Sequence, residues 1–158
     1  MEFHPAKCQL LKISRKKNKI YHDYKIHNQT LKETKCAKYL GVMIDNELRW
    51  KEHIKMVQQK ANNTIAFLRR NIPTKCPQKV KEQCFKTLVK PILEYGCCVW
   101  DPHLRTQVDN LEKVHKNAAR FVNNNYSYTQ GSTLHNMKQL GWIPLEEQRA
   151  RNKITIFY

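Results

Sequence analysis

Lysine and arginine side chains recur along residues 51–81 and could bind phosphate groups. The candidates are Lys51, Lys55, Lys60, Arg69, Arg70, Lys75, Lys79 and Lys81. Cationic side chains displace counterions from phosphates, so nucleic-acid binding through them weakens steeply as salt rises and carries no sequence specificity. These residues therefore predict a phosphate-binding surface. For any single lysine, an ordinary solvated position on a helix is the simpler interpretation.

Four other side chains in the chain invite a chemical role, and the sequence favours a structural one for three of them. His53 has no nucleophile or carboxylate that can be placed beside it, so no general-base role is assigned. Trp50 and Trp100 could stack nucleic-acid bases, but each lies at the edge of an apolar pattern, which favours core packing. Arg120 could pair with a carboxylate or reach a phosphate, and the sequence leaves both open.

The cysteines do not form a metal-binding pattern. They are Cys8, Cys36, Cys76, Cys84, Cys97 and Cys98, without the paired spacing of zinc ribbons or a following histidine pair. Free cysteine packs readily as a small apolar side chain. We expect mostly structural cysteines, no metal site and no cofactor.

Charge narrows the class of partner. The chain has 158 residues and a formal net charge of +16, which makes a polyanion the first partner to consider. It has no apolar run long enough to span a bilayer, so we expect no membrane insertion. The first residues, MEFHPAKCQLLKISRKKNK, lack the basic and apolar regions of a secretory signal. We expect an intracellular protein, nuclear or cytoplasmic.

Strand patterns occupy the region between Cys8 and Ile44. The segment CQLLKIS is short and apolar, RKKNK is a polar turn, and alternation over residues 22–26 completes a predicted hairpin. Asn28 and Gln29 predict a second turn. Residues 38–44 then predict one further strand, in which Gly41 marks a bulge or a close backbone approach, or an ordinary packing position.

Helical spacing begins after Asp45. Asp45 or Asn46 is the expected cap of a first helix, whose apolar stripe comprises Ile54, Val57, Ala61, Ile65, Leu68 and Ile72. A second helix is expected to start at Pro77 and to be central and largely buried. Its expected main stripe is Val80, Cys84, Leu88, Ile92 and Tyr95, broadened by Phe85, Val89 and Leu93. Pro91 is expected to kink this helix or to end its first part.

Three further helices are expected after Pro102. The first opens at Thr106 and stops at Asn123–Asn125. Ser132 is expected to cap a short helix that Gly141 stops, and Pro144 to open the last one. The expected fold is α+β and predominantly helical: a small antiparallel hairpin or sheet in residues 1–45, followed by a helical bundle in residues 46–158.

Three blocks of this sequence carry a family resemblance. They are KYLGVMIDNELRWKEHI, KTLVKPILEYGCCVWDPHLRTQVDNLEKVHKNAARFV and TLHNMKQLGWIPLEEQRARNKITIFY. In this order they resemble the downstream part of reverse transcriptases from non-LTR retrotransposons of the jockey-like kind. MEFHPAKC resembles the tail of the family's W-x-M-x-F-N-x-x-K-C block. The resemblance implies that residues 1–45 are the end of the polymerase palm and residues 46–158 a thumb-like bundle.

The chain departs from that family in its acidic residues. Such polymerases place paired aspartates, one set in an aromatic-Ala-Asp-Asp turn, around two metal ions. The aspartates here are Asp23, Asp45, Asp101 and Asp109, and none is adjacent to another. We therefore expect no catalytic residue and no nucleotidyl transfer in this chain, with Mg²⁺ needed only by the complete polymerase.

Two function classes follow. The first is a fragment of a retrotransposon RNA-directed DNA polymerase that contributes binding of the RNA/DNA template-primer duplex. Its second expected partner is the remainder of the polymerase, if the two are expressed together. The alternative is a basic helical module, derived from a transposable element, that binds protein or RNA without a polymerase role. No motif with a nucleophile, a base and an orienting group supports another enzyme. A palm end cut from its sheet would expose a strand edge, so we also expect the region from Cys8 to Ile44 to be poorly held.

Overall fold

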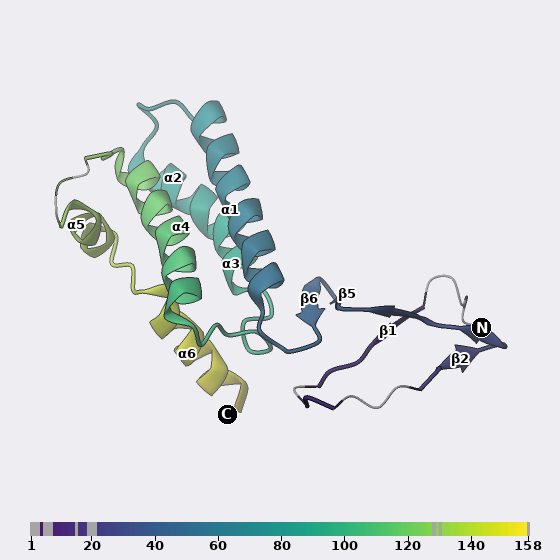
Figure 1. The fold of residues 1–158 in the computed structure, drawn as a ribbon. Helices are drawn as coiled ribbons and strands as arrows, with labels where there is room; N and C mark the ends of the chain where they lie inside the picture. Colours follow the sequence, from purple (N-terminus) through teal and green to yellow (C-terminus); the bar gives the residue numbers. More distant parts are fainter. Residues whose placement is uncertain are drawn as a thin grey trace. The chain divides into compact units, whose positions relative to one another are not determined.

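The computed structural model describes residues 4, 8–14, 16–18, 22–127, 129 and 131–157. The chain forms two compact units, Met1–His53 and Ile54–Tyr158, shown in Figure 1. The predicted fold class, α+β and predominantly helical, is confirmed. The division lies within the first helix, beyond the predicted domain boundary at residue 45, and the functional meaning of that boundary stays a prediction.

The N-terminal unit contains three two-stranded sheets. They pair β1 (Gln9–Leu11) in parallel with β4 (Lys32–Thr34), β2 (Lys25–Ile26) antiparallel with β3 (Gln29–Thr30), and β5 (Cys36–Tyr39) antiparallel with β6 (Val42–Asp45). Among the described residues, each of these strands pairs with one other strand.

The hairpin predicted from the region between Cys8 and Ile26 is wrong. β1 pairs with β4, while β2 pairs with the residues that follow it. His27 and Asn28, with φ of 48° and 60°, form the turn between β2 and β3. Closing so short a loop costs less chain entropy than closing a longer one, which favours the local pairing. Arg15 and Lys19 of the predicted RKKNK turn lie outside the described residues.

The single strand predicted over residues 38–44 is also wrong, because the chain reverses in its middle. Leu40 and Gly41 have φ of 45° and 85°, and Tyr39 pairs with Val42 across them. Two consecutive residues with positive φ are what a tight type I′ hairpin turn requires, and glycine adopts that conformation without strain. Gly41 is therefore a turn residue, not a bulge.

Asp45 ends β6 and organises the turn that leads into the first helix. Its Oδ1 accepts from the backbone N–H groups of Glu47 (2.9 Å) and Arg49 (3.1 Å), and its Oδ2 from those of Arg49 (3.0 Å) and Trp50 (2.9 Å). Partial burial opposes ionisation, but these backbone bonds outweigh it and lower the pKa of Asp45. The prediction that Asp45 or Asn46 caps the first helix is wrong, because that helix begins at Lys51 and the amides bonded to Asp45 all precede it.

The remaining elements are helical. They are α1 (Lys51–Asn71), α2 (Gln78–Cys84), the π-helical segment η2 (Phe85–Val89), α3 (Lys90–Glu94), α4 (Arg105–Asn123), α5 (Ser132–Gln139) and α6 (Leu145–Phe157). Figure 1 shows α1 and α4 running side by side, and Arg69 on α1 bonds Asn117 on α4. The predicted stripe of α1 is buried from Ile54 to Leu68, as the spacing required. No described helix is long and apolar enough to cross a membrane.

The stripe predicted for the second helix is wrong. Val80, Leu88 and Tyr95 are 47%, 48% and 60% exposed, whereas Phe85, Val89 and Leu93 are buried. The positions expected only to broaden the stripe form its centre. The central place in the bundle belongs to α4, which packs against α2, α5 and α6.

A π-helical segment lies within this buried stripe. The backbone N–H of Lys90 donates to the carbonyl oxygen of Phe85, five residues earlier in the chain. Lys90 is the residue immediately before Pro91. A proline ring would clash with the carbonyl four residues earlier in a regular helix, and the wider turn accommodates it. Positions spaced by four drift about 40° per step around a regular α-helix. The wider π turn opposes that drift, so Phe85, Val89 and Leu93 stay on one side.

The connections around α5 largely follow the sequence. Asn124 ends α4 with φ of 55°, Gly141 ends α5 with φ of 63°, and Pro144 precedes α6. Ser132 differs from expectation, because its hydroxyl donates to Ser127 O while Gly131 occupies the cap position. Glycine is suited to that position because its φ is 85°.

Candidate nucleic-acid interface

Besides Arg69, the exposed side of α1 carries four of the predicted cations. Lys51, Lys55, Lys60 and Arg70 are exposed. Lys51 belongs to the N-terminal unit, and the other three to the helical unit. Because Lys55 and Lys60 are five residues apart, they point about 140° apart around the helix axis. The cations therefore spread across the whole exposed side of α1 instead of forming one narrow line.

Two more cations follow where α1 ends. Lys75 lies in the turn between α1 and α2, and Lys79 in the first turn of α2, both exposed. The turn is closed by backbone bonds from Cys76 to Pro73 O (3.0 Å) and from Val80 to Pro77 O (3.1 Å). Arg70, Lys75 and Lys79 are thus carried on a hydrogen-bonded corner of the bundle.

Arg69 is exposed but already engaged. Its Nη2 donates to Asn117 O at 3.1 Å, and its guanidinium lies 5.3 Å from the centroid of the Tyr126 ring. A guanidinium has five N–H donors, so a further acceptor such as phosphate can still be bound. Arg69 also helps to hold α1 against α4.

The expectation that Lys81 lies on an exposed face is wrong. Lys81 is 2% exposed, and its ammonium donates to Thr74 O at 2.8 Å and lies 6.0 Å from the centroid of the Phe121 ring. Lys81 precedes Phe85 by four residues and shares its buried side of the helix. Its charge therefore holds the α1–α2 turn and is not presented to solvent.

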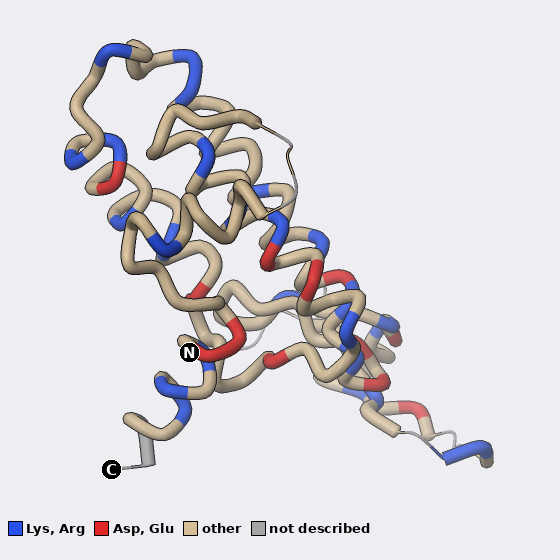
Figure 2. Tube along the Cα trace, turned by 90° about the vertical axis from the view of Figure 1, so that its left-hand side faces the viewer, with Lys and Arg blue, Asp and Glu red and all other residues tan. Residues whose placement is uncertain are grey.

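The chain has no acidic residue between Glu52 and Glu82, a signal that the sequence interpretation missed. Figure 2 shows Lys and Arg, with no Asp or Glu, along the turn that joins α1 to α2 at the top of the helical unit. No described residue forms an ion pair or a hydrogen bond with the cationic side chain of Lys51, Lys55, Lys60, Arg70, Lys75 or Lys79. Their charges are left uncompensated by neighbours.

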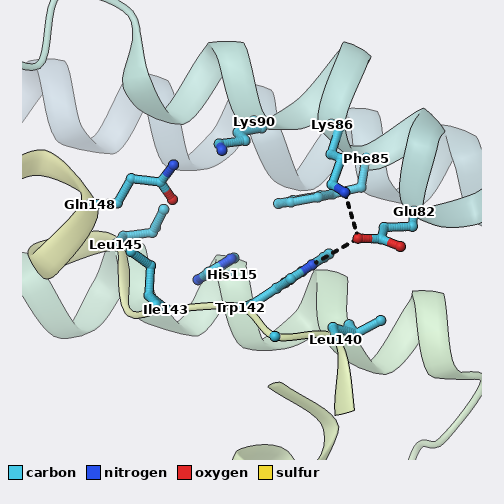
Figure 3. A pocket seen from close by; sticks show the side chains of 11 residues that line it. Glu82, Phe85, Lys86, Lys90, His115, Leu140, Trp142, Ile143, Leu145 and Gln148 are labelled. Atoms are coloured by element: carbon cyan, nitrogen blue, oxygen red, sulfur yellow. Dashed lines mark hydrogen bonds and ion pairs between the residues drawn. The ribbon is translucent and has the colours of Figure 1, made fainter. Parts of the chain in front are cut away.

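The next two lysines after Glu82 are paired, by contrast. Lys86 lies 2.7 Å from Glu82 and Lys90 lies 3.7 Å from Glu94, measured between ammonium nitrogen and carboxylate oxygen. Both lysines line a cavity of about 220 Å³, where Figure 3 shows the bonds from Lys86 and Trp142 meeting at Glu82. Burial raises the pKa of Glu94, although Lys90 and His115 act against it. This cavity adds no uncompensated lysine to the surface.

The other residues that invited a chemical role have structural partners. His53 is buried and its Nδ1 accepts from Met43 N–H at 3.2 Å. Trp100 is fully buried and donates from Nε1 to Tyr95 O at 2.7 Å. Arg120 donates to Asn117 Oδ1 (3.1 Å) and Thr133 Oγ1 (2.9 Å), which ties α4 to α5. Trp50 is half-buried.

Three of the aspartates are engaged with protein groups. Asp45 accepts backbone amides, Asp101 pairs with Arg149 (3.1 Å) and Lys153, and Asp109 pairs with Arg105 (3.2 Å). Among the described residues, no group of three His, Cys, Asp or Glu side chains could hold a metal ion. The donor set of a two-metal site is not found in the part of the chain that the structure describes, and we derive no metal-dependent step.

Two curated proteins of Drosophila melanogaster are similar to this chain. The probable RNA-directed DNA polymerase from transposon BS is 26% identical over 118 residues, which are 73% of this chain and 13% of that protein. The probable RNA-directed DNA polymerase from transposon X-element is 22% identical over 110 residues, 68% of this chain and 12% of that protein. The chain spans about an eighth of the length of these relatives. No protein-family model matches it, and no solved structure matches it significantly. The similarities support an origin related to reverse transcriptases.

Proposed function

We propose that this chain is part of a retrotransposon RNA-directed DNA polymerase and contributes binding of an RNA/DNA template-primer duplex. The supporting observation is the run of exposed, unpaired cations between Glu52 and Glu82. Uncompensated lysines and arginines on a rigid helical surface are the groups that neutralise nucleic-acid phosphates. The two similar polymerases act on RNA templates by name, which agrees in class with this partner.

The proposed binding surface in the helical unit comprises Lys55, Lys60, Arg70, Lys75 and Lys79, with Arg69 beside them. Lys51 is an exposed cation of the N-terminal unit and is proposed as a separate phosphate contact. Lys81 is left out, because its ammonium is buried against Thr74 and Phe121. The proposal gives the chain a positioning role without nucleotidyl transfer. This role agrees with the aspartates, none of which is adjacent to another in the sequence. Three of them, Asp45, Asp101 and Asp109, are also bonded to protein groups.

The test is binding of the purified chain to a fluorescently labelled RNA–DNA primer-template across a salt series. Replacing Arg70, Lys75 and Lys79 with Gln should lower the affinity and reduce the log–log salt slope by about 0.9 for each phosphate that is no longer neutralised. The matched control replaces Lys113, Lys116 and Lys138 with Gln, which removes the same charge from another part of the helical unit. The control should bind nearly as the unchanged chain does.

Equal decreases in affinity for the two triple variants would contradict the proposal, because net charge alone would then explain binding. A tighter complex with a primer-template junction than with plain duplex would support a role in holding the primer end. Affinity equal to that of an unrelated protein of similar charge would count against it.

A further inference from the structure

A groove between α4 and α5 lies apart from the surface proposed to bind nucleic acid. It has a volume of about 590 Å³, within the range typical of ligand sites. Its walls come from α4, α5, the connection between α5 and α6, and the first turn of α6. Its lining includes Lys116, Leu134, Met137, Lys138, Trp142 and Pro144.

The lining of the groove is largely apolar. Leu134 is 61% exposed although it lies beside Met137, which is buried. Pro144 and the half-buried ring of Trp142 continue the apolar surface. A concave apolar surface with an exposed leucine on its wall is suited to receive the apolar side chains of a partner.

The charges at the groove leave a positive excess. Its carboxylates are already engaged: Glu146 pairs with Arg105 at 3.2 Å, and Glu112 accepts from the backbone N–H of Glu146 at 3.1 Å. Lys116 and Lys138 form no ion pair or side-chain hydrogen bond with any described residue. The groove therefore presents two uncompensated ammonium groups beside an apolar surface, which matches a partner with both acidic and apolar side chains.

The wall formed by α5 is fixed in place. Asn136 is fully buried. Its backbone carbonyl oxygen accepts from the side-chain amide of Asn123 (2.9 Å), and its side-chain oxygen accepts from the side-chain amide of Asn125. Arg120 on α4 bonds Thr133 on α5 at 2.9 Å. A preformed groove binds a partner without the entropy cost of first ordering its own wall.

The indole ring of Trp142 in the groove argues against stacked nucleic-acid bases as the occupant. Trp142 is stacked on Phe85 and His115, with ring centroids 4.3 Å and 5.0 Å apart, and Figure 3 shows the three side chains together. Single-stranded nucleic acid is held mainly by aromatic faces that are free to stack. The exposed apolar groups here are aliphatic, and these favour protein side chains.

We propose that the α4–α5 groove binds an acidic amphipathic helix of a protein partner. Leucine-like side chains of that helix lie against Leu134, Met137 and Pro144, and its carboxylates face Lys116 and Lys138. This docking mode places apolar anchors one helical turn apart in a groove. The inference does not rest on nucleic-acid binding, since the residues of the two surfaces are different.

The probe is a fluorescein-labelled peptide of about 15 residues, with leucines at i, i+4 and i+7 and glutamates at the positions that flank this leucine stripe. We expect it to bind the full chain and to shift the methyl NMR signals of Leu134 and Met137. Leu134→Glu should weaken binding about tenfold, the effect expected from removing one buried leucine side chain. Lys116→Glu with Lys138→Glu should weaken it and remove most of its salt dependence.

Two controls separate this groove from general stickiness. Ile154→Glu changes an apolar residue of similar exposure, 60%, outside the groove and should leave the affinity unchanged. A peptide of the same composition with its leucines scattered should not bind. Because Leu134 is exposed, circular dichroism should show Leu134→Glu to be folded.

The inference is overturned if Leu134→Glu binds the peptide as the unchanged chain does, or if the scattered peptide binds equally well. It is also overturned if labelled oligouridine shifts the groove signals and displaces the peptide, because the occupant would then be nucleic acid. Loss of duplex binding in the Arg70, Lys75 and Lys79 variant with peptide binding retained would show the two surfaces to be independent.

Discussion

Among the described residues of the N-terminal unit only Val42 and His53 are buried, whereas the helical unit buries side chains from each of its longer helices. The first unit is organised by bonds to the Asp45 carboxylate, by the His53 ring and by three short ladders. The second is organised by apolar packing around α4. Polar bonds exchange with water at little net gain, so the first unit should be the less stable of the two.

The largest effect should come from the core of the helical unit. Leu93→Ala removes a fully buried side chain and should destabilise this unit by about 2–5 kcal/mol, because a cavity remains. Leu88→Ala, five residues earlier and 48% exposed, is the matched control and should cost less than about 1 kcal/mol. Urea denaturation followed by circular dichroism measures both. Equal destabilisation by the two substitutions would mean that the described packing does not hold the bundle.

A second prediction separates a structural lysine from a surface lysine. Lys81→Ala removes the bond to Thr74 O and the buried side-chain stem, and should destabilise the helical unit by about 2 kcal/mol. Lys79→Ala should leave stability nearly unchanged and weaken duplex binding instead. Thermal melts and duplex titrations of both variants check this. If the Lys81→Ala variant folded normally but bound the duplex much more weakly, Lys81 would have to be counted as a phosphate contact.

In the N-terminal unit, Asp45→Ala should cost about 1–2 kcal/mol, because the amides of Glu47, Arg49 and Trp50 lose their acceptor. The pKa of Asp45 is lowered in the folded chain, so its contribution is present above about pH 4 and is lost as the pH falls through the lowered pKa. Hydrogen exchange should report weaker protection at Arg49 and Trp50. If α4 lost protection equally, the two units would not be separable in stability.

The smallest effect should be a pH dependence that comes from His53. Burial lowers its pKa, and the neutral ring accepts from Met43 N–H. The unfolded chain takes up this proton first, so the stability of the N-terminal unit should fall as the pH drops below about 6.5. Hydrogen exchange of the Met43 amide, corrected for the pH dependence of the intrinsic exchange rate, measures this loss of stability. His53→Gln should remove it, while His103→Gln, at an exposed position, should retain it.

Local rules predicted the helices better than the strands. The stripe of α1, the stop at Asn124 and the start after Pro144 follow from spacing, left-handed asparagine and the missing proline amide, which act within a few residues. Strand pairing depends on which segments of the chain meet in space. The two-residue turn at Leu40 and Gly41 does not interrupt the alternation of side chains in the sequence, so the pattern does not reveal it. Sequence alternation alone could not separate one strand from two.

For the candidate interface, the exposure of the α1 cations was predictable, whereas the burial of Lys81 and the bond made by Arg69 were not. The lysines of α1 lie off its apolar stripe, and the structure exposes them. Lys81 lies on the stripe of Phe85, Val89 and Leu93, but the sequence pattern marked that stripe only as secondary. The bond between Arg69 and Asn117 joins residues distant in sequence, so no local pattern announces it.

The unpaired cations between Glu52 and Glu82 also affect the folded chain by itself. Like charges held on one side of the bundle repel each other, and salt screens this repulsion over a Debye length of about 10 Å at 0.1 M. Raising the salt concentration should therefore stabilise the free protein while it weakens any complex with a polyanion. The conditions in which this chain is easiest to keep folded are the ones in which it is least able to hold nucleic acid.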